Sequence, residues 1–235
     1  MEISKQKSIK LSVVIPVYNE LETLEKILKK VKAVPVSKEI ILVDDGSTDG
    51  SREILEKLKR KDASLKIIFQ KENQGKGAAL RAGFKEAIGE LVIVQDADLE
   101  YDPADYLKLI AHLKSSLVDV VYGSRFMGSY KDMTTLHYWG NRVLTFFTNL
   151  FFGVVLTDME TCYKLIPLEI IKKIDIKSNR FNFEPEITAK ILKMGKKIKE
   201  VPISYAGRTA SEGKKITWKD GFSALATLIK FRFLD

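Results

Sequence analysis

Acidic side chains follow a short apolar run in the middle of the chain, in the sequence Gln95-Asp-Ala-Asp-Leu-Glu100. If strand alternation continued past the end of this run, Asp96, Asp98 and Glu100 would point to one side. Oxygen ligands of this kind suit Mg²⁺ or Mn²⁺, and such an ion can neutralise the charge that develops on a diphosphate. A strand-ending turn and a helix cap explain the same residues equally well, since Asp102-Pro103 is typical of a helix start.

Three other polar loops have compositions that suit phosphate or nucleoside binding. Pro16-Val-Tyr-Asn-Glu20 follows the first apolar run and Asp44-Asp-Gly-Ser47 follows the second. A carboxylate in the second loop can accept hydrogen bonds from a base or ribose, although a turn with an N-cap is an equal explanation. Asn73-Gln-Gly-Lys-Gly77 opens a helical pattern, where backbone amides and Lys76 would lie near phosphate. It lacks P-loop spacing, and the absence of GxGxxG after the first run disfavours a dinucleotide-dependent dehydrogenase.

The loops must be positioned by an alternation of apolar runs and amphipathic segments. Strands are predicted at Leu11–Ile15, Glu39–Val43, Lys66–Phe69, Leu91–Val94 and Val118–Tyr122. Helices are predicted between them, near Leu21–Val31, Gly50–Arg60, Gly77–Ile88 and Pro103–Leu113. Such a βαβ series forms a mostly parallel sheet, and the loops at the carboxyl ends of its strands meet at one edge. The sequence therefore predicts an α/β fold with the polar loops together.

The second half of the chain has a less regular pattern. It predicts an aromatic helix, a strand, a helix and a closing helix at Tyr138–Phe152, Cys162–Ile166, Glu184–Met194 and Trp218–Phe233. Neither a repeat nor a linker interrupts the chain, so we expect residues 1–235 to form one domain.

The composition limits the class of protein. With 235 residues and 45% hydrophobic residues, the chain can bury a full core, and its net charge of +8 favours anionic partners. The single cysteine, Cys162, excludes an intramolecular disulfide and favours a reducing compartment. Met1 to Lys10 contains no signal peptide, and the apolar stretch Val143 to Leu156 is too short to span a bilayer. We therefore expect a cytoplasmic protein without a transmembrane segment.

Taken together, the polar motifs resemble those of family-2 inverting glycosyltransferases, in the same order along the chain. Val43-Asp-Asp-Gly-Ser-Thr-Asp49, Gln95-Asp-Ala-Asp98 and Gly123-Ser-Arg125 carry the resemblance most clearly. It is closest to the branch of dolichol-phosphate mannosyltransferases and polyprenyl-phosphate glycosyltransferases. It extends to Tyr205-Ala-Gly-Arg208 and Glu212-Gly-Lys-Lys215, and so covers nearly the whole chain.

The resemblance implies a GT-A, Rossmann-like fold in which about residues 1–125 bind the nucleotide sugar and about 126–235 bind the acceptor. Asp96 and Asp98 would bind both the metal and the donor, with Glu100 as a third metal ligand. Other donor contacts would come from Pro16, Tyr18, Glu20, Asp44, Asp45, Lys76 and Gln95. The acceptor phosphate would be bound by Arg125, Arg142 and Arg208. Asp98, Arg125 and Arg208 would then be the catalytic residues.

The implied reaction moves a hexose from a donor of the GDP-mannose or UDP-glucose type to a polyprenyl or dolichyl phosphate. A phosphate acceptor is already anionic, so positioning and charge neutralisation dominate over general base catalysis. If the acceptor were a neutral sugar hydroxyl, the base would be Glu184, Glu186 or Asp158. For Glu184 and Glu186, which flank Pro185 at a predicted helix start, a structural role is the simpler explanation.

Two apolar helices suggest how such an enzyme would reach a lipid. The helices at Tyr138–Phe152 and Trp218–Phe233 mix aromatic, aliphatic and basic residues and can lie in a membrane interface. Nearby basic residues add about 1 kcal/mol each at an anionic membrane; they are Lys214, Lys215, Lys219, Lys230 and Arg232. Core packing or a dimer contact explains the apolar residues equally well. The resembled enzymes often carry C-terminal membrane helices that this sequence lacks, so we expect peripheral attachment at the cytoplasmic face.

Other functions fit part of the sequence. A glycosyltransferase with a sugar or other non-lipid acceptor, or a non-catalytic nucleotide-sugar-binding protein, would share the motifs, although intact Asp96, Asp98 and Arg125 disfavour the latter. A sugar-1-phosphate nucleotidyltransferase would need a Gly-rich basic loop where Pro16 to Glu20 stands. Nucleic-acid binding ranks last because no recognised module is present. The motifs do not select the donor base or sugar, because pocket shape does.

Overall fold

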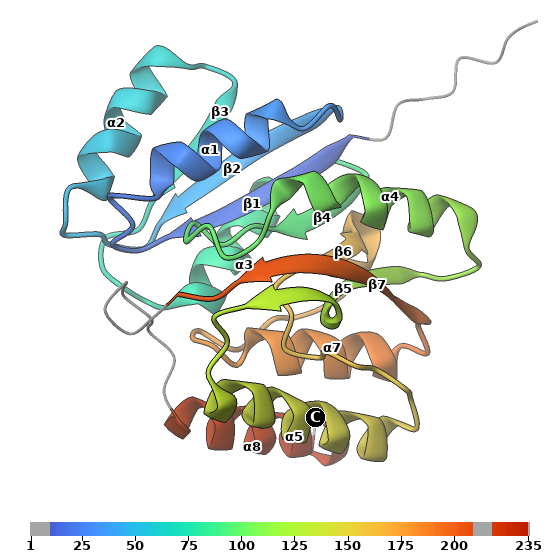
Figure 1. Ribbon diagram of the computed structural model, residues 1–235. Coiled ribbons are helices and arrows are strands. Elements are labelled where there is room, and N and C mark those ends of the chain that lie inside the picture. The colour runs from blue at the N-terminus through green and yellow to red at the C-terminus, as the bar shows by residue number, and fades with distance from the viewer. Residues whose placement is uncertain (1–9, 209–217, 235) are drawn as a thin grey trace, which may run out of the picture.

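The computed structural model describes residues 10–208 and 218–234, with the side chains of 218–220 excepted (Figure 1). A seven-stranded sheet with the order β3-β2-β1-β4-β6-β5-β7 divides the molecule. The strands are β1 Leu11–Val17, β2 Lys38–Asp44, β3 Leu65–Phe69, β4 Leu91–Val94, β5 Val120–Lys131, β6 Lys164–Pro167 and β7 Ile198–Ala206. The helices are α1 Leu24–Ala33, α2 Ser51–Lys61, α3 Lys76–Glu86, the 3₁₀-helix η1 Pro103–Asp105, α4 Tyr106–Ser115, α5 Thr135–Phe152, α6 Leu168–Ile171, α7 Phe183–Lys193 and α8 Trp218–Phe233.

The first four strands are parallel and form the regular part of the sheet. β1 lies between β2 and β4, and β3 pairs with the far side of β2. The side chains of β1, β2 and β4 are almost all buried on both faces, which explains why these strands are largely apolar runs rather than alternations. β3, at the edge of the sheet, is only partly buried. The predicted strands and helices of this region are confirmed, with their bounds shifted by a few residues. The carboxyl ends of β1, β2 and β4 meet at one edge, as the sequence predicts.

The later strands differ from the sequence prediction. The predicted strand at Val118–Tyr122 corresponds to β5, which begins at Val120 and continues to Lys131. The predicted strand at Cys162–Ile166 corresponds to β6, which begins at Lys164. The two N–H groups before β6 are not available to the sheet, because the Tyr101 hydroxyl accepts from the Cys162 amide and the Thr161 hydroxyl accepts from the Tyr163 amide. β6 runs antiparallel to both of its neighbours.

β7, over Ile198–Ala206, is a strand that the sequence analysis missed. It pairs in parallel with β5 at the edge of the sheet and contains Pro202, a residue that strands accept mainly at edges. Its exposed and buried residues alternate, as expected for a strand that is covered on one face. The strand ends two residues before Arg208, so it delivers that arginine to the functional edge of the sheet.

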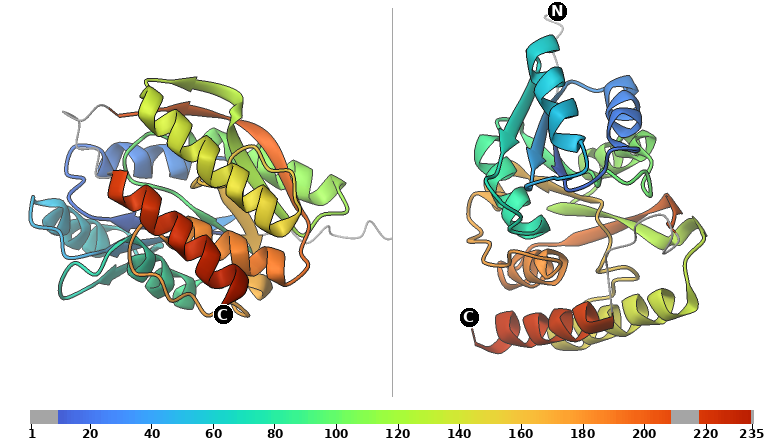
Figure 2. Two further views of the ribbon diagram at one scale, coloured as in Figure 1. Left: turned by 90° about the horizontal axis from the view of Figure 1, so that it is seen from below. Right: turned by 90° about the vertical axis from the view of Figure 1, so that its left-hand side faces the viewer.

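Helices cover both faces of the sheet and form an additional layer below it. α3 packs on β1 and β2, whereas α4 packs on β5 and β7. α7 lies between the sheet and the pair α5 and α8, which run side by side at the bottom of the molecule (Figures 1 and 2). A small second core joins this pair, made by Leu144, Met159, Ala224 and Leu228. Within the described residues, no helix has the length and apolarity needed to cross a membrane.

Candidate functional site

The loops after β1 and β2 are joined to each other by hydrogen bonds. The Asn19 amide donates to the Ser47 hydroxyl at 3.1 Å, and the Asn19 side chain accepts from the Thr48 amide at 2.8 Å. Gly46 has a φ of +75°, and a Cβ atom there would lie 2.7 Å from the backbone of Glu72 and Asn73. Only glycine therefore lets the loop after β2 approach the loop after β3 so closely. The result is a rigid floor made of three loops.

Two buried carboxylates from the end of β2 brace this floor. Asp45 accepts from the backbone amides of Gln74 and Gly75, both at 2.8 Å, and from the Asn73 side chain at 3.1 Å. Burial raises the pKa of Asp45. Asp44 accepts from the Ser47 amide at 3.1 Å and lies 3.2 Å from Arg52 Nε. The amides before α3 that were predicted to face phosphate therefore face Asp45 instead.

The acidic run after β4 is a turn, not a continuation of the strand. β4 ends at Val94, and Leu99 has a positive φ of 66°, so the predicted alternation of Asp96, Asp98 and Glu100 does not hold. Asp96 instead faces Lys76, whose Nζ lies 2.9 Å from Asp96 and 2.8 Å from Glu184. Lys76 is thus shared by two carboxylates at the start of α3, which favours its protonated form and raises its pKa.

Arg208 faces the other half of the acidic run. Its Nη2 lies 3.1 Å from Asp98 Oδ2, and its Nη1 lies 3.1 Å from Glu20 Oε2. The Glu100 carboxylate accepts from the Arg208 amide at 2.8 Å and from the Tyr205 hydroxyl at 2.8 Å. Burial, together with the charges of Asp96 and Glu100, raises the pKa of Asp98 to about 7. A single guanidinium therefore lies beside three carboxylates, those of Glu20, Asp98 and Glu100, and cannot neutralise all of them.

These residues have the chemistry of a site for a hard cation, but they are not gathered into one. Among the described residues, no three histidine, cysteine or acidic side chains are arranged to hold a metal ion. Asp96 and Asp98 offer oxygen ligands, and their mutual repulsion in a buried place favours an added divalent cation. Glu100 would first have to give up one of its two hydrogen bonds. The metal prediction for these three residues stays a prediction.

Two of the three predicted acceptor arginines lie together. Arg125 is buried and donates through Nε and Nη2 to the two oxygens of Asp158, both at 2.7 Å. Its Nη1 has no hydrogen-bond partner among the residues that the structure describes. Arg142 is exposed, and its guanidinium lies 5.6 Å from the Phe126 ring centroid, while that of Arg125 lies 5.7 Å from the same ring. Both guanidinium groups therefore flank one aromatic side chain.

Tyr205 connects the arginine pair to the acidic cluster. Its ring centroid lies 5.3 Å from the Arg125 guanidinium, and its hydroxyl donates to Glu100 at 2.8 Å. Tyr205 belongs to the motif Tyr205-Ala-Gly-Arg208, but the sequence did not predict a role for it. Its position follows from β7, which the sequence did not reveal as a strand.

The remaining predicted residues have different surroundings. Gln95 is fully buried, and its side chain accepts from the Tyr106 and Tyr163 hydroxyls, both at 2.6 Å, so it supports the turn from within rather than facing a donor. Pro16 and Tyr18 are half-buried at the end of β1. Glu212, Lys214 and Lys215 lie outside the described residues.

The three candidate general bases are all engaged with other groups. Asp158 binds Arg125, and Glu184 pairs with Lys76. Glu186 accepts from the amides of Lys177 and Ser178, both at 2.7 Å. Glu160, which the sequence did not mark as a candidate, has a buried Oε1 without a hydrogen-bond partner among the described residues, and burial raises its pKa to about 8. The contacts of Asp158, Glu184 and Glu186 do not favour a base that is ready to deprotonate a sugar hydroxyl.

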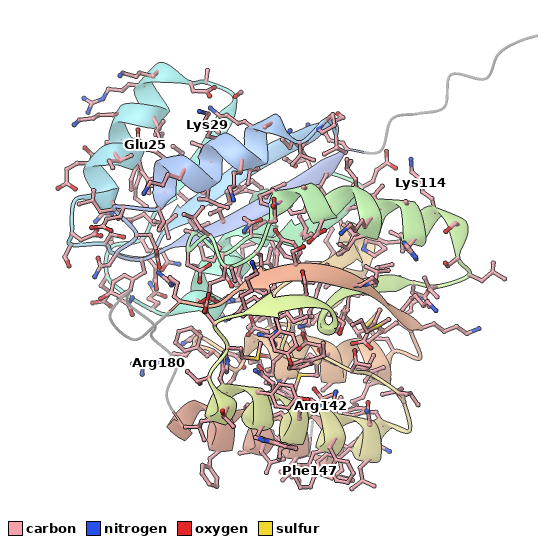
Figure 3. The ribbon with its side chains drawn as sticks, in the orientation of Figure 1. Glu25, Lys29, Lys114, Arg142, Phe147 and Arg180 are labelled. Carbon is pink, nitrogen blue, oxygen red and sulfur yellow. The ribbon has the colours of Figure 1, made fainter. Side chains whose placement is uncertain are left out.

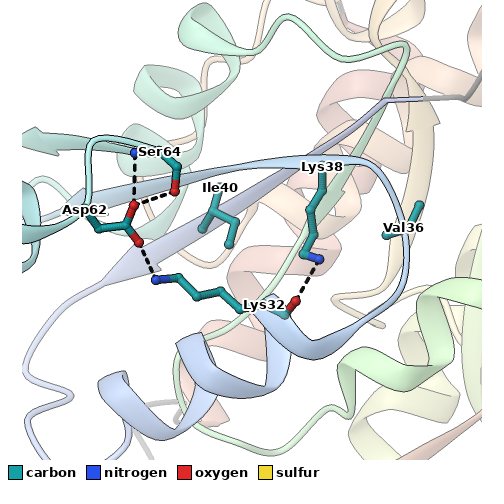
Figure 4. A pocket seen from close by; sticks show the side chains of 6 residues that line it. All are labelled: Lys32, Val36, Lys38, Ile40, Asp62 and Ser64. Carbon is teal, nitrogen blue, oxygen red and sulfur yellow. Dashed lines mark hydrogen bonds and ion pairs between the residues drawn. The ribbon is translucent and has the colours of Figure 1, made fainter.

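A surface hollow at the opposite edge of the sheet is not part of this site (Figure 4). Its lining residues are Lys32, Val36, Lys38, Ile40, Asp62 and Ser64. They surround the amino-terminal ends of β2 and β3. Lys32 Nζ lies 2.5 Å from Asp62, and Lys38 donates to the Lys32 and Val34 carbonyls. In a parallel sheet the ligand lies at the carboxyl ends instead.

Comparison with known sequences identifies the family. Residues 12–175 match the family described as glycosyl transferase family 2. The chain belongs to this family. An uncharacterised protein of Methanocaldococcus jannaschii is 32% identical, over 97% of this chain and 98% of its own. The undecaprenyl-phosphate mannosyltransferase of Micrococcus luteus is 28% identical over 86% of this chain and 85% of its own. The dodecaprenyl-phosphate galacturonate synthase of Rhizobium johnstonii is 30% identical over 86% of this chain and 60% of its own.

Solved structures of similar shape confirm the predicted GT-A fold. Mannosyl-3-phosphoglycerate synthase of Rubrobacter xylanophilus has a TM-score of 0.75 at 17% identity, covering 96% of this chain and 74% of its own. Glucosyl-3-phosphoglycerate synthase of Mycobacterium tuberculosis, in complex with Mn²⁺, UDP and phosphoglyceric acid, has a TM-score of 0.71 at 17% identity, covering 97% and 80%. This family-2 glycosyltransferase therefore has the GT-A fold.

Proposed function

We propose that this family-2 glycosyltransferase moves a hexose from a GDP- or UDP-sugar to a polyprenyl phosphate, with inversion. The observation that carries the proposal is the pair Arg125 and Arg142 around Phe126, which Tyr205 connects to the acidic cluster at the end of β4. An acceptor phosphate needs guanidinium groups, whereas the donor diphosphate needs the cluster and its cation. Two relatives are named for undecaprenyl and dodecaprenyl phosphate, which supports the same class of acceptor here.

The loops after β1 and β2 would bind the nucleoside of the donor. Asp44 and Asp45 are fixed by backbone amides and by Arg52, so carboxylate oxygens are already oriented when a base or ribose arrives. Lys76 stands between Asp96 and Glu184 and would contribute positive charge on the side of the diphosphate. A fixed site of this kind lowers the cost of orienting the donor.

The residues that would hold Mg²⁺ or Mn²⁺ are Asp96 and Asp98. Glu100 would join them once one of its two hydrogen bonds is broken. The ion supplies charge neutralisation of the departing nucleoside diphosphate. The structural neighbour from Mycobacterium tuberculosis has been crystallised with Mn²⁺ and UDP, and also with Mg²⁺ and UDP, which supports a divalent ion at the equivalent edge.

Arg125 would fix the attacking phosphate. Asp158 accepts from its Nε and Nη2, so the guanidinium is already fixed. Nη1 could then bind the phosphate without a further loss of side-chain conformational entropy. Arg142 would bind the phosphate from the solvent side of Phe126. No side chain has to remove a proton, because the attacking oxygen of a phosphate is already charged.

A peripheral membrane surface on α5 and α8 would bring the lipid to Arg142. The exposed apolar residues of α5 recur along one stripe: Leu136, Trp139, Val143, Phe146 and Leu150. α8 adds Phe222, Ile229 and Phe233. α5 contains no acidic residue, while Lys230 and Arg232 of α8 are exposed beside it. Figure 3 shows Arg142 and Phe147 on α5, in the layer farthest from β1 to β3. An anionic bilayer matches both the apolar stripe and its charge.

The transfer is tested with radiolabelled UDP- and GDP-sugars, Mn²⁺ or Mg²⁺, and a polyprenyl phosphate in detergent. Label in the organic phase that requires the metal and Arg125 is the expected result, and the donor that supplies it names the sugar. Arg125→Gln should abolish the transfer, while Arg60→Gln, at an exposed position on α2, is the control. Label transferred only to soluble sugars or phosphates would refute the lipid acceptor.

Membrane attachment is tested by flotation with vesicles of phosphatidylcholine alone or with one third phosphatidylglycerol. We expect binding to the anionic vesicles and its loss in the double variant Trp139→Ser/Phe146→Ser. The matched control, Ile88→Ser/Leu117→Ser, replaces exposed apolar residues on other parts of the surface. Equal flotation of the two double variants would refute the assignment of this face.

A further inference from the structure

Arg208 occupies the place where a donor diphosphate and its metal would bind. Its guanidinium lies between Glu20, which follows β1, and Asp98, which follows β4, at 3.1 Å from each. Its Nε is 3.9 Å from Glu100 Oε1. The side chain is only 17% exposed, so the charges face each other with little water between them. Three carboxylates from two loops thus converge on a single arginine.

The backbone of Arg208 also holds the cluster in this arrangement. Its amide donates to Glu100 Oε1 at 2.8 Å, while the Tyr205 hydroxyl donates to Glu100 Oε2 at 2.8 Å. Both oxygens of Glu100 and one oxygen of Asp98 therefore have partners that come from the end of β7 or the residues just after it. A cation that coordinated Asp98 and Glu100 would need the same lone pairs.

We propose that Arg208 is an internal counter-ion that competes with the divalent metal for Asp98, and that metal and nucleotide binding displace it. The inference rests on the proposed function and deepens it, since it names the group that neutralises the carboxylates of the same site before the donor binds. An arginine and a divalent cation cannot both lie against one carboxylate without strong repulsion. Displacing the guanidinium also ends the 3.9 Å ion pair between its Nε and Glu100 Oε1, while the Arg208 amide keeps its hydrogen bond to that oxygen.

Displacement gives Arg208 a second position to occupy. Tyr205, three residues earlier, already lies against Arg125. An arginine that leaves Asp98 would therefore remain close in sequence to a residue that contacts the proposed phosphate site. Its positive charge would then be available to the acceptor only when the acidic cluster has another cation. Arg208 would then be the counter-ion of Asp98 before the metal binds and a ligand of the acceptor phosphate after it.

Lys76 provides a useful contrast. It pairs with Asp96 at 2.9 Å, but Glu184 at 2.8 Å holds it from the other side. If metal binding draws Asp96 away, Lys76 keeps Glu184 as a partner and need not move. Arg208 would keep Glu20 in the same way, but it also lies 3.9 Å from Glu100, a further predicted metal ligand.

The test measures Mn²⁺ binding directly, by titrating free Mn²⁺ with electron paramagnetic resonance in the absence of nucleotide. Arg208→Gln should bind Mn²⁺ more tightly than the wild-type chain by at least about fivefold, the lower end of ordinary coupled equilibria. Arg208→Lys, which keeps the charge but cannot bridge Glu20 and Asp98 with a planar fork, should bind Mn²⁺ with an intermediate affinity. The control, Arg60→Gln, removes an exposed arginine of α2 that contacts the Glu56 carbonyl and should leave Mn²⁺ affinity unchanged.

Thermal unfolding gives a second measurement that needs no catalysis. Without metal, Arg208→Gln should melt below the wild-type chain, because its carboxylates repel one another, and Mn²⁺ should raise its melting temperature more than that of the wild type. If Arg208→Gln does not fold, Arg208→Lys alone decides the question. Equal or weaker Mn²⁺ affinity in the folded variants overturns the competition while leaving the glycosyltransferase proposal intact. Absence of Mn²⁺ binding to every protein, even with UDP or GDP, overturns both the metal assignment and the competition.

Discussion

The two sides of the site hold their buried charges in different ways. On the side proposed to bind the donor, Asp45 is fixed by the amides of Gln74 and Gly75, which belong to the neighbouring loop. On the side proposed to bind the acceptor, Asp158 binds the guanidinium of Arg125, 33 residues away along the chain. The first arrangement uses neutral backbone groups, whereas the second buries a pair of opposite charges.

The difference has energetic consequences. A carboxylate that accepts from amides can be replaced by a neutral amide side chain with the loss of one or two hydrogen bonds. A carboxylate that neutralises a buried guanidinium cannot, because the partner charge would remain in a place without water. The stability of the fold should therefore tolerate loss of the Asp45 charge but not loss of the Asp158 charge.

The largest effect is expected from Asp158→Asn. The substitution keeps the size of the side chain but leaves the buried Arg125 without a counter-charge, which should lower the free energy of unfolding by about 3–5 kcal/mol. Urea denaturation followed by circular dichroism measures the loss. The double variant Asp158→Asn/Arg125→Met, which removes both charges, should recover part of it. No recovery would mean that the hydrogen bonds of Asp158, rather than its charge, stabilise the region.

Asp98→Asn should have the next largest effect, on activity rather than stability. In the proposed function Asp98 would bind the cation of the donor diphosphate, and asparagine lacks the charge for this, so the rate of transfer should fall by about 10²- to 10³-fold. Asp102→Asn is the control, because Asp102 lies in the same loop but only caps η1 through the Ala104 amide. Full turnover by Asp98→Asn would remove this residue from the metal and donor site.

The same contrast explains what the sequence could predict. The donor loops follow uninterrupted apolar strands, and their residues interact with loops whose positions follow from the parallel order of β1, β2 and β4. Their common location was therefore predictable from sequence, although the hydrogen bonds of Asp45 were not. The backbone turn at Leu99 was also missed, since strand alternation cannot reveal a positive φ at a leucine.

The acceptor side was less accessible to prediction because its geometry depends on long-range pairing. Asp158 was considered as a base, but its pairing with Arg125 requires knowledge of how β5 lies beside β6. β7 went unpredicted, and with it the place of Tyr205 and the contacts of Arg208. Single-sequence patterns report local conformation and burial, not which distant charges meet.

A smaller effect should follow from Gly83→Ala on the donor side. A Cβ atom at Gly83 would lie 2.4 Å from Val14 Cγ1 and 3.3 Å from Val43 Cγ2, so α3 would have to move off the sheet. Overpacking of this kind costs about 1–3 kcal/mol. Gly140→Ala, in α5 with nothing within 4 Å of the added atom, is the control and should stabilise the chain slightly. Unchanged stability of Gly83→Ala would show that α3 moves easily.

The smallest effect is expected from Asp45→Asn, the donor-side counterpart of Asp158→Asn. The asparagine oxygen can keep at least one backbone amide of the loop after β3, so we expect a loss in unfolding free energy of no more than about 1 kcal/mol. Burial raises the pKa of Asp45 above its ordinary value of 3.8, which means that the folded state binds this proton more tightly than the unfolded state does.

The sign of the pH dependence follows from this shift. The contribution of Asp45 to stability is greatest at acidic pH and falls as pH rises through the ordinary range of the group, whereas asparagine does not titrate. Asp45→Asn should therefore be closer to the wild type at pH 7 than at pH 4 in urea denaturation. A loss at pH 7 as large as that of Asp158→Asn would contradict the comparison, because it would mean that the charge of Asp45 is as necessary to the donor loops as that of Asp158 is to Arg125.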